Sequence, residues 1–225
     1  LKCPEELSSA VLKAMQETGL PSPERWDDAW ACIKKVWASK WNRRAFLSRR
    51  SRAIPEQDLF MAVLIQEVVK ADYSYVIHTV NPFSGERDEI YAEAVVGLGE
   101  ALVGNYPGRA LSFSRKKGGQ EPALLSYPGK SVGLFGGGLI FRSDSNREDL
   151  EEYAGAGLYD SFMLPEARKV TLDYTDEKIV WDGGFRGKFM SGVADIGELV
   201  EKVFGSPQDI EGAFSGTSFY VVQAR

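Results

Sequence analysis

The stretch DLFMAVLIQEVV (58–69) places the strongest constraint on the fold of this chain. It is too continuously apolar for a strand with one solvated face, and it predicts a buried strand. Gln66 interrupts the run with a single amide. A buried amide without partners costs about 1–3 kcal/mol, so Gln66 is expected to have a polar partner. That partner is either a backbone group of the protein or an adenine presented to the strand.

Helical and extended segments surround this run. Residues 5–19 form an amphipathic pattern that ends at a glycine before two prolines, and residues 25–51 continue as a second, longer helical stretch. Strands are expected at YSYVIHTVNPFSG (73–85) and at the start of DEIYAEAVVGLGEALVG (88–104). The helical stretch carries tryptophans close to one face, a spacing more typical of a core than of sugar stacking. These are Trp26, Trp30, Trp37 and Trp41.

The second half of the chain is read in the same way. Residues 116–138 are rich in Gly, Pro and Lys and predict an exposed connection. A strand near 168–174, a helix near 184–204 and a terminal hairpin follow. Because helices and strands alternate irregularly, the pattern predicts a mixed α/β or α+β fold.

Composition argues against several classes of protein. The chain has 225 residues and a net charge of -5, which does not favour a general nucleic-acid or membrane surface. Cys3 and Cys32 are too few for a disulfide scaffold and lack metal-ligand spacing, which favours a reducing compartment. No run approaches the length of a membrane span. The start LKCPEEL resembles neither a signal peptide nor an initiator end, and it suggests an internal piece of a longer protein.

The terminal hairpin carries the clearest chemical signal. SPQDIEG (206–212) and YVVQAR (220–225) flank the turn-like AFSGTS, and residues two apart in a strand share a face. Asp209 and Glu211 can therefore lie on one face with Gln223 and Arg225. Carboxylates suit Mg²⁺ bridged to phosphates, and an arginine can neutralise charge on a transferring phosphoryl group. The alternative is a surface hairpin with paired charges.

A second signal lies in FRSDSNREDLEEYAGAGLYDS (141–161). Arg142 precedes a polar turn, the glycines of AGAG (154–157) allow backbone N–H groups to approach an anion, and Ser161 adds a hydroxyl. The spacing is not that of a Walker loop, and a Gly-rich linker is the alternative. GLGE (97–100) is a weaker motif. His78 lies in the middle of a strand without a companion nucleophile, so a hydrogen-bonded structural role is favoured over acid–base or phosphohistidine chemistry.

Together these stretches closely resemble the C-terminal part of the α-glucan, water dikinases, the starch-phosphorylating enzymes of plants and algae. The resemblance covers about 26–225 and rests on KKVWASKWNRRAF, MAVLIQEVVKADYSYVIHTVNPFSG, EIYAEAVVGLGEALVGNYPGRALSF, the 141–161 segment and the terminal hairpin. More distantly, it extends to the ATP-grasp nucleotide-binding domain of phosphoenolpyruvate synthase and pyruvate phosphate dikinase. It implies an ATP-grasp-like domain, incomplete on its N-terminal side. The parts are a helical lead-in (1–52), a hinge-strand lobe (58–115) and a phosphate- and metal-binding lobe (139–225).

The resemblance also implies ligands and roles. ATP would lie between lobes, with adenine against a hinge strand at Gln66 to Val68 and Glu100 near the ribose. Arg142, Gly157 and Ser161 would hold phosphates. Mg²⁺ and phosphates would meet Asp209, Glu211, Gln223 and Arg225, with Arg142 and Arg225 as the catalytic arginines. The implied reaction passes the β-phosphate of ATP to a histidine on another domain and then to glucan, and the γ-phosphate to water.

The same resemblance implies a location and partners. It indicates a plastid protein associated with starch granules, acting on α-glucan through the full-length chain and its phosphohistidine domain. Arg147 and Glu152 stand where these dikinases usually have glycine. A small-molecule dikinase of the pyruvate or phosphoenolpyruvate type, or a non-catalytic nucleotide-binding module, are the alternatives. The sequence leaves the oligomeric state open, a homodimer included.

Overall fold

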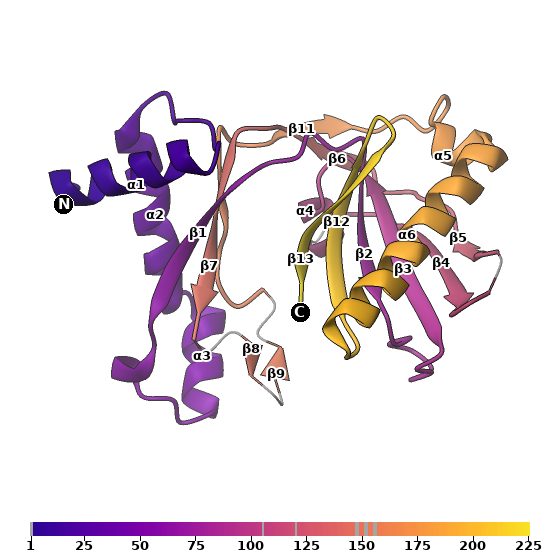
Figure 1. The fold of residues 1–225 in the computed structure, drawn as a ribbon, viewed down its shortest axis with the longest axis horizontal. Helices are drawn as coiled ribbons and strands as arrows, with labels where there is room; N and C mark the ends of the chain where they lie inside the picture. Colours follow the sequence, from indigo (N-terminus) through magenta and orange to yellow (C-terminus); the bar gives the residue numbers. More distant parts are fainter. Residues whose placement is uncertain (1, 105, 120, 147–148, 151–152, 155–156) are drawn as a thin grey trace. The chain divides into compact units, whose positions relative to one another are not determined.

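The fold mixes helices and antiparallel sheets, as the sequence predicts (Figure 1). The computed structural model describes residues 2–104, 106–119, 121–146, 149–150, 153–154 and 157–225. The helices are α1 (Glu5–Glu17), α2 (Trp26–Ala38), α3 (Arg43–Ser51), α4 (Glu100–Val103), α5 (Lys178–Trp181) and α6 (Gly183–Phe204), with short 3-10 turns η1 (Ser39–Trp41) and η2 (Glu56–Asp58). The strands are β1 (Met61–Glu67), β2 (Tyr73–His78), β3 (Glu89–Val96), β4 (Leu111–Lys116), β5 (Ala123–Ser126), β6 (Val132–Phe135), β7 (Leu139–Ser145), β8 (Asp149–Leu150), β9 (Tyr153–Ala154), β10 (Phe162–Leu164), β11 (Arg168–Thr171), β12 (Asp209–Ser215) and β13 (Ser218–Ala224).

The chain divides into two compact units that are interleaved along the sequence. Unit 1 comprises Leu1–Val68 and Gly136–Ala167, and unit 2 comprises Val69–Phe135 and Arg168–Arg225. The chain therefore crosses from one unit to the other three times. Each of the segments 58–115 and 139–225 contributes to both units, because β1 pairs with the distant β7 in unit 1.

Unit 1 is built on a three-stranded antiparallel sheet in the order β1-β7-β10, with α2 against one face. Met61, Val63 and Ile65 of β1 pack into the core under α2. The residues between them point to the other face of the sheet, where Leu64 is 52% exposed. The prediction of a buried strand at 58–69 is therefore wrong. β1 is an edge strand with α2 against one face, and its residues are half-buried or exposed.

The second helical stretch is broken where a single helix over 25–51 was expected. Asn42 adopts an extended backbone conformation, and its Oδ1 accepts a hydrogen bond from the N–H of Ala45 at 2.8 Å. An asparagine in this position caps a new helix and ends the preceding one. Trp30 is buried and meets Trp37 edge-to-face at 5.4 Å, as expected of a core stripe. Trp41 lies beyond the end of α2 and is exposed.

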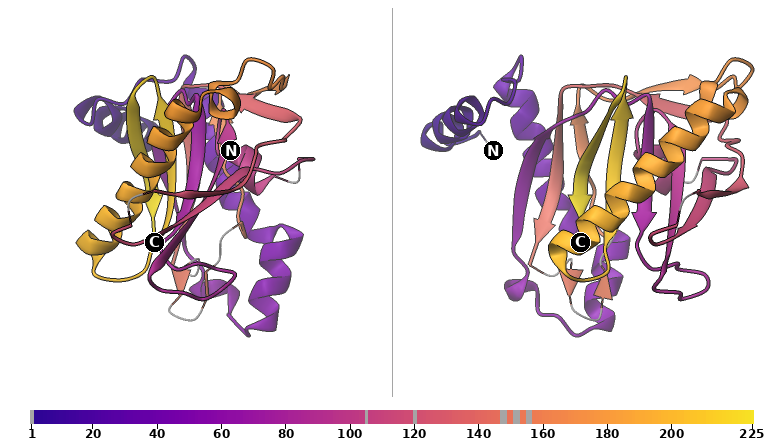
Figure 2. Two further views of the ribbon diagram at one scale, coloured as in Figure 1. Left: turned by 90° about the vertical axis from the view of Figure 1, so that its right-hand side faces the viewer. Right: turned by 45° about the vertical axis from the view of Figure 1, so that its right-hand side comes forward.

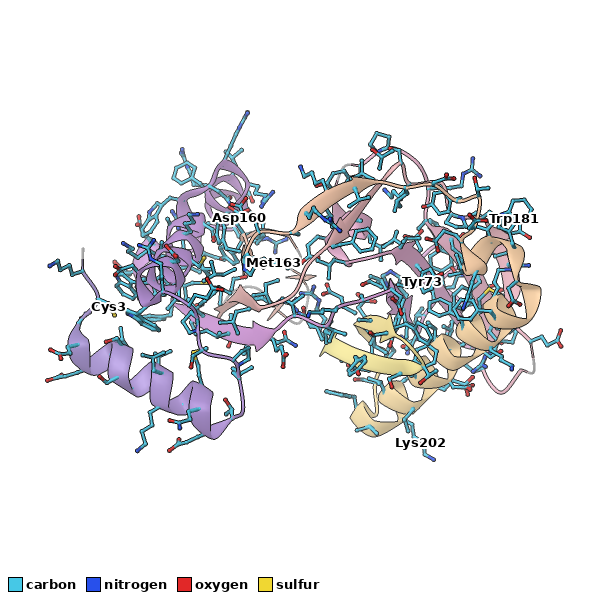
Figure 3. All side chains as sticks on the ribbon, turned by 90° about the horizontal axis from the view of Figure 1, so that it is seen from above. Cys3, Tyr73, Asp160, Met163, Trp181 and Lys202 are labelled. Atoms are coloured by element: carbon cyan, nitrogen blue, oxygen red, sulfur yellow. The ribbon has the colours of Figure 1, made fainter. Side chains whose placement is uncertain are left out.

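Unit 2 is built on a six-stranded antiparallel sheet in the order β13-β12-β2-β3-β4-β5. The long helix α6 crosses β2 and β3 and reaches β13 on one face, which Figures 1 and 2 show in orange over the sheet. Tyr73, labelled in Figure 3, meets Phe189 of α6 there at 5.6 Å between ring centroids. This face buries the core of the unit. Its fully buried members include Tyr75, Ile77, Ile90, Phe113, Phe189, Val193 and Ile210.

Residues 116–138 are more ordered than the sequence predicts. β5 extends the large sheet, and β6 pairs with β11 in a separate two-stranded ribbon. Leu134 of β6 is buried, and its carbonyl accepts a hydrogen bond from Leu98 at 2.8 Å. The prediction of an exposed connection is therefore wrong for β6, whereas β5 is ordered but keeps exposed residues such as Leu125. Within the described ranges, none of the helices has the length and apolar character to traverse a lipid bilayer.

Candidate functional site

The terminal hairpin brings together the four polar side chains that alternation predicts. Asp209 and Arg225 exchange both backbone hydrogen bonds, at 2.8 and 3.0 Å. Glu211 lies directly opposite Gln223 in the β12–β13 register. Residues directly opposite one another in an antiparallel pair project to the same face. The arrangement predicted from the two-residue spacing is therefore confirmed by the register.

This polar face is the side of the sheet opposite α6. Ile210, which lies between the two acidic residues, is fully buried in the α6 core. Because successive strand residues alternate, Asp209 and Glu211 point away from that core. Their side chains are 54% and 34% exposed, against 20% for Arg225. The carboxylates are thus accessible, while the arginine beside them is more buried.

Electrostatics within the hairpin link the two acids to the arginine. Arg225 Nη2 lies 3.8 Å from Glu211 Oε1, an ion pair between neighbouring strands. The described residues include no group of three or more His, Cys, Asp and Glu side chains arranged to hold a metal ion. Mg²⁺ needs fewer protein ligands, because it commonly uses one or two carboxylates and completes its shell with water and substrate phosphates. Two accessible carboxylates and an amide on one face therefore fit Mg²⁺ bound together with a polyphosphate.

His78 adds a contact that sequence reasoning missed. It lies opposite Asp209 in the β2–β12 register, and its Nδ1 is 2.6 Å from Asp209 Oδ1. This hydrogen bond is the main cause of a lowered pKa of the Asp209 carboxyl. The prediction of a hydrogen-bonded histidine is confirmed, but its partner is one of the candidate metal ligands. No local signal reveals this partner, because the two residues are 131 positions apart.

Glu100 belongs to the same unit. It is the first residue of α4, and the preceding Gly99 lies against the side chain of Ser74. A Cβ built on Gly99 would be 3.6 Å from the Cβ of Ser74. Ser74 pairs with Ala213, two residues beyond Glu211 on β12. Glu100 therefore starts a helical turn next to the polar face. This turn lies near Ala213, two residues beyond Glu211 along β12.

Unit 1 holds the remaining candidates. In the β1–β7 register Leu64 lies opposite Arg142 and Gln66 opposite Ile140. Gln66 and Arg142 are therefore diagonal neighbours on the face of the sheet that α2 leaves uncovered. The N–H of Val68, just after β1, donates to Gly138 O at 2.9 Å. The face thus combines exposed apolar surface at Leu64 with an amide and a guanidinium.

The segment before β10 carries the other predicted phosphate contacts. Gly157 has φ +74°, in the left-handed region that glycine adopts readily, and Ser161 is exposed. Phe162 lies opposite Phe141, so extending the register by one residue brings Ser161 to the level of Arg142. Arg147, Glu152, Gly155 and Ala156 lie outside the described residues.

The start of α3 holds this segment in place, which the sequence did not indicate. The side-chain amide of Asn42 donates to Leu158 O at 2.9 Å, and Arg44 Nε donates to the same oxygen at 3.2 Å. Arg44 also forms an ion pair with Asp160, which is labelled in Figure 3 with Met163 of the following strand. Two side chains from a helix more than a hundred residues away therefore tether the stretch between Gly157 and Ser161.

The first half of the chain matches a known protein family. Residues 3–110 match the family described as pyruvate phosphate dikinase, AMP/ATP-binding domain. The matched residues include Gln66, Val68 and Glu100, whereas Arg142 and the terminal hairpin lie beyond them. The chain is 30% identical over 224 residues to a probable phosphoenolpyruvate synthase of Archaeoglobus fulgidus, covering 98% of this chain and 25% of that protein.

The likeness to one group of dikinases is much stronger. The chain is 52% identical over 232 residues to the chloroplastic alpha-glucan water dikinase of Solanum tuberosum, covering 100% of this chain and 16% of that protein. It is also 52% identical over 232 residues to alpha-glucan water dikinase 1 of Arabidopsis thaliana, again over 100% of this chain and 17% of that protein. The resemblance drawn from its motifs is confirmed: the chain is related over its whole length to one segment of the α-glucan water dikinases. It spans less than a fifth of the length of these plant relatives.

Proposed function

We propose that this chain is the ATP-binding phosphotransfer domain of a glucan, water dikinase, with an ATP-grasp-like architecture. The observation that carries the proposal is the convergence of Asp209, Glu211, Gln223 and Arg225 on the accessible face of the terminal hairpin. The likeness to plant dikinases over the whole chain supports it. A non-catalytic nucleotide-binding module would not need an acidic pair next to an arginine.

Each unit supplies a different part of the chemistry. In unit 2 the Asp209 and Glu211 carboxylates would hold Mg²⁺ with the Gln223 amide, and Arg225 would neutralise charge on the phosphates. The metal, when bound, supplies charge neutralisation for the transferring phosphoryl group. Glu100 would contact the ribose.

In unit 1 the open face of β1 and β7 is the candidate surface for adenine and for phosphates. Gln66 and the Val68 backbone would contact adenine beside the apolar surface of Leu64. Arg142, Gly157 and Ser161 would contact phosphates, with Arg142 as the candidate catalytic arginine of this unit. The tether from Asn42 and Arg44 to Leu158 would keep the phosphate segment in place.

The full-length protein would complete the reaction. A histidine on a separate domain would receive the β-phosphate of ATP and pass it to α-glucan, while the γ-phosphate goes to water. Such a protein would act on starch in the plastid, in keeping with the chloroplastic relatives. The likeness to a probable phosphoenolpyruvate synthase is weaker, so a small-molecule acceptor is the second choice.

Calorimetric titration of the 225-residue chain with ATP tests the proposal. We expect Mg²⁺-dependent binding with a dissociation constant of about 0.1–1 mM, and no labelled phosphoprotein, since the acceptor domain is elsewhere. Glu211→Ala should remove the Mg²⁺-dependent part of the affinity, and Asp209→Ala should weaken it. Glu201→Ala is the matched control, because Glu201 pairs with Lys117 at 2.6 Å on α6.

Two results would contradict the proposal. One is a folded wild-type chain that fails to bind ATP. The other is a Glu211→Ala variant of the full-length parent that still forms phosphohistidine at the wild-type rate. A folded Glu211→Ala chain that loses only Mg²⁺-dependent binding would support it.

A further inference from the structure

Four directly opposed residues form one continuous row across neighbouring strands of unit 2. Arg225 of the terminal hairpin lies opposite Asp209, Asp209 opposite His78, and His78 opposite Tyr91 on β3. Directly opposed residues in an antiparallel sheet share a face. All four side chains therefore lie on the polar face, and the candidate metal ligand Asp209 has a neighbour on each side.

The backbone and the side chain of Asp209 are held by different partners. Its N–H and C=O are both bonded to Arg225 across the hairpin. Its side chain is held from the other strand, where His78 Nδ1 lies 2.6 Å from Oδ1. The hydrogen bond uses one carboxylate oxygen, so Oδ2 is the oxygen that His78 leaves for a further ligand. A carboxylate more than half exposed would otherwise sample several rotamers.

His78 itself is held by an aromatic neighbour. Its ring lies nearly parallel to that of Tyr91, with centroids 6.3 Å apart and an interplanar angle of 28°. Tyr91 is buried, donates from its hydroxyl to Glu93 Oε1 at 2.7 Å, and lies edge-to-face with Phe83 at 5.0 Å between ring centroids. Burial together with that hydrogen bond raises the pKa of Tyr91 to about 12, so it remains a neutral aromatic surface. The imidazole plane is therefore supported by a residue that is itself fixed.

We propose that His78 is a positioning residue for the metal that Asp209 binds: it holds Oδ1 so that the carboxylate presents Oδ2 to Mg²⁺. This inference rests on the proposed function, which assigns the metal to Asp209 and Glu211. His78 takes no part in proton or phosphoryl transfer in this role. Partners that orient a metal ligand typically change metal affinity 10- to 100-fold when they are removed.

Three substitutions of His78 separate its hydrogen bond from its shape. His78→Phe keeps a flat ring against Tyr91 but removes the donor. His78→Asn places an amide near the position of Nδ1 and keeps a donor for Asp209. His78→Gln is polar and of similar size, but its amide reaches the position of Nε2 instead. Asp209→Asn is the reference for loss of the ligand itself.

The measurement is the ratio of ATP affinities of the 225-residue chain in excess Mg²⁺ and in EDTA, by calorimetry, with circular dichroism to confirm folding. We expect His78→Phe and His78→Gln to reduce this ratio about tenfold, His78→Asn to retain it within about threefold, and the affinity in EDTA to stay unchanged for all three. A structural role alone would lower both affinities together. Rescue by asparagine but not by glutamine would support the geometry.

The outcomes distinguish this inference from the function on which it rests. If Asp209→Asn reduces the ratio and neither His78→Phe nor His78→Gln does, the role of His78 is wrong and the metal site stands. If the wild-type ratio is one, or Asp209→Asn leaves it unchanged, the metal assignment fails and the role of His78 fails with it. If His78→Phe does not fold, His78→Gln against His78→Asn decides the question.

Discussion

Replacing Gly212 by alanine should destabilise unit 2, because the space for a side chain at this position is already filled. A Cβ built on Gly212 would lie 2.2 Å from Cε2 and Cζ of Tyr75 and 2.4 Å from its hydroxyl oxygen. Tyr75 is 1% exposed, and its hydroxyl donates to Tyr220 O at 3.0 Å. The ring would have to retreat by about 1 Å to reach an ordinary contact distance, and Phe189 and Phe219 pack against it.

Two costs add up for Gly212→Ala. Overpacking a filled core costs about 1–3 kcal/mol, and losing the hydrogen bond of a buried hydroxyl costs about 1–3 kcal/mol. We therefore expect the free energy of unfolding to fall by about 2–6 kcal/mol, measured by urea denaturation with circular dichroism. The position adjoins Glu211, where the β12–β13 register shifts, so the same variant tests how tightly the hairpin is packed.

A double-mutant cycle identifies the clash as the cause. In a Tyr75→Leu background the ring is gone, and Gly212→Ala should then cost less than about 1 kcal/mol, because the two sites are in direct contact and couple. An equal cost in both backgrounds would refute the reasoning. So would a cost below about 0.5 kcal/mol in the wild-type chain, which is the range of a surface substitution.

Three further predictions concern stability. The hydrogen bond from His78 lowers the pKa of Asp209. The ionised Asp209 therefore stabilises the fold above the usual aspartate pKa of about 3.9, and this stabilisation is lost as the pH falls through the lowered native pKa. The difference in unfolding free energy between wild type and Asp209→Asn should therefore shrink between pH 5 and pH 2, and a difference that grows on acidification would contradict this. Arg115→Met should lower the free energy of unfolding by about 1–3 kcal/mol in urea denaturation, because the guanidinium is 5% exposed and lies 2.7 Å from Glu198 Oε1. An unchanged free energy would show that apolar packing replaces the ion pair. Asn42→Ala should cost about 0.5–2 kcal/mol by losing the cap of α3, and Asn42→Asp should recover most of it, which a thermal melt of each variant would check.

The sequence alone determined the elements that local periodicity and turn chemistry specify. The helix expected at 5–19 is α1, that near 184–204 is α6, and the terminal hairpin forms as predicted. The two-residue spacing of the acids was enough to place Asp209 and Glu211 on one face, because alternation along a strand is a property of the backbone. The motifs also sufficed to identify the relatives.

Only the tertiary structure decided which faces are covered and which distant residues meet. The apolar run of β1 reads as buried, yet its pairing with β7 at the edge of a small sheet leaves one face open, with Gln66 and Arg142 on it. The contact of His78 with Asp209 joins residues 131 positions apart, and that of Asn42 with Leu158 joins residues 116 apart. Contacts of such separation depend on strand order and register, which are set by the packing of whole elements. Such contacts leave no periodic pattern in the local sequence. The sequence around His78 therefore does not reveal that its partner is the Asp209 carboxylate.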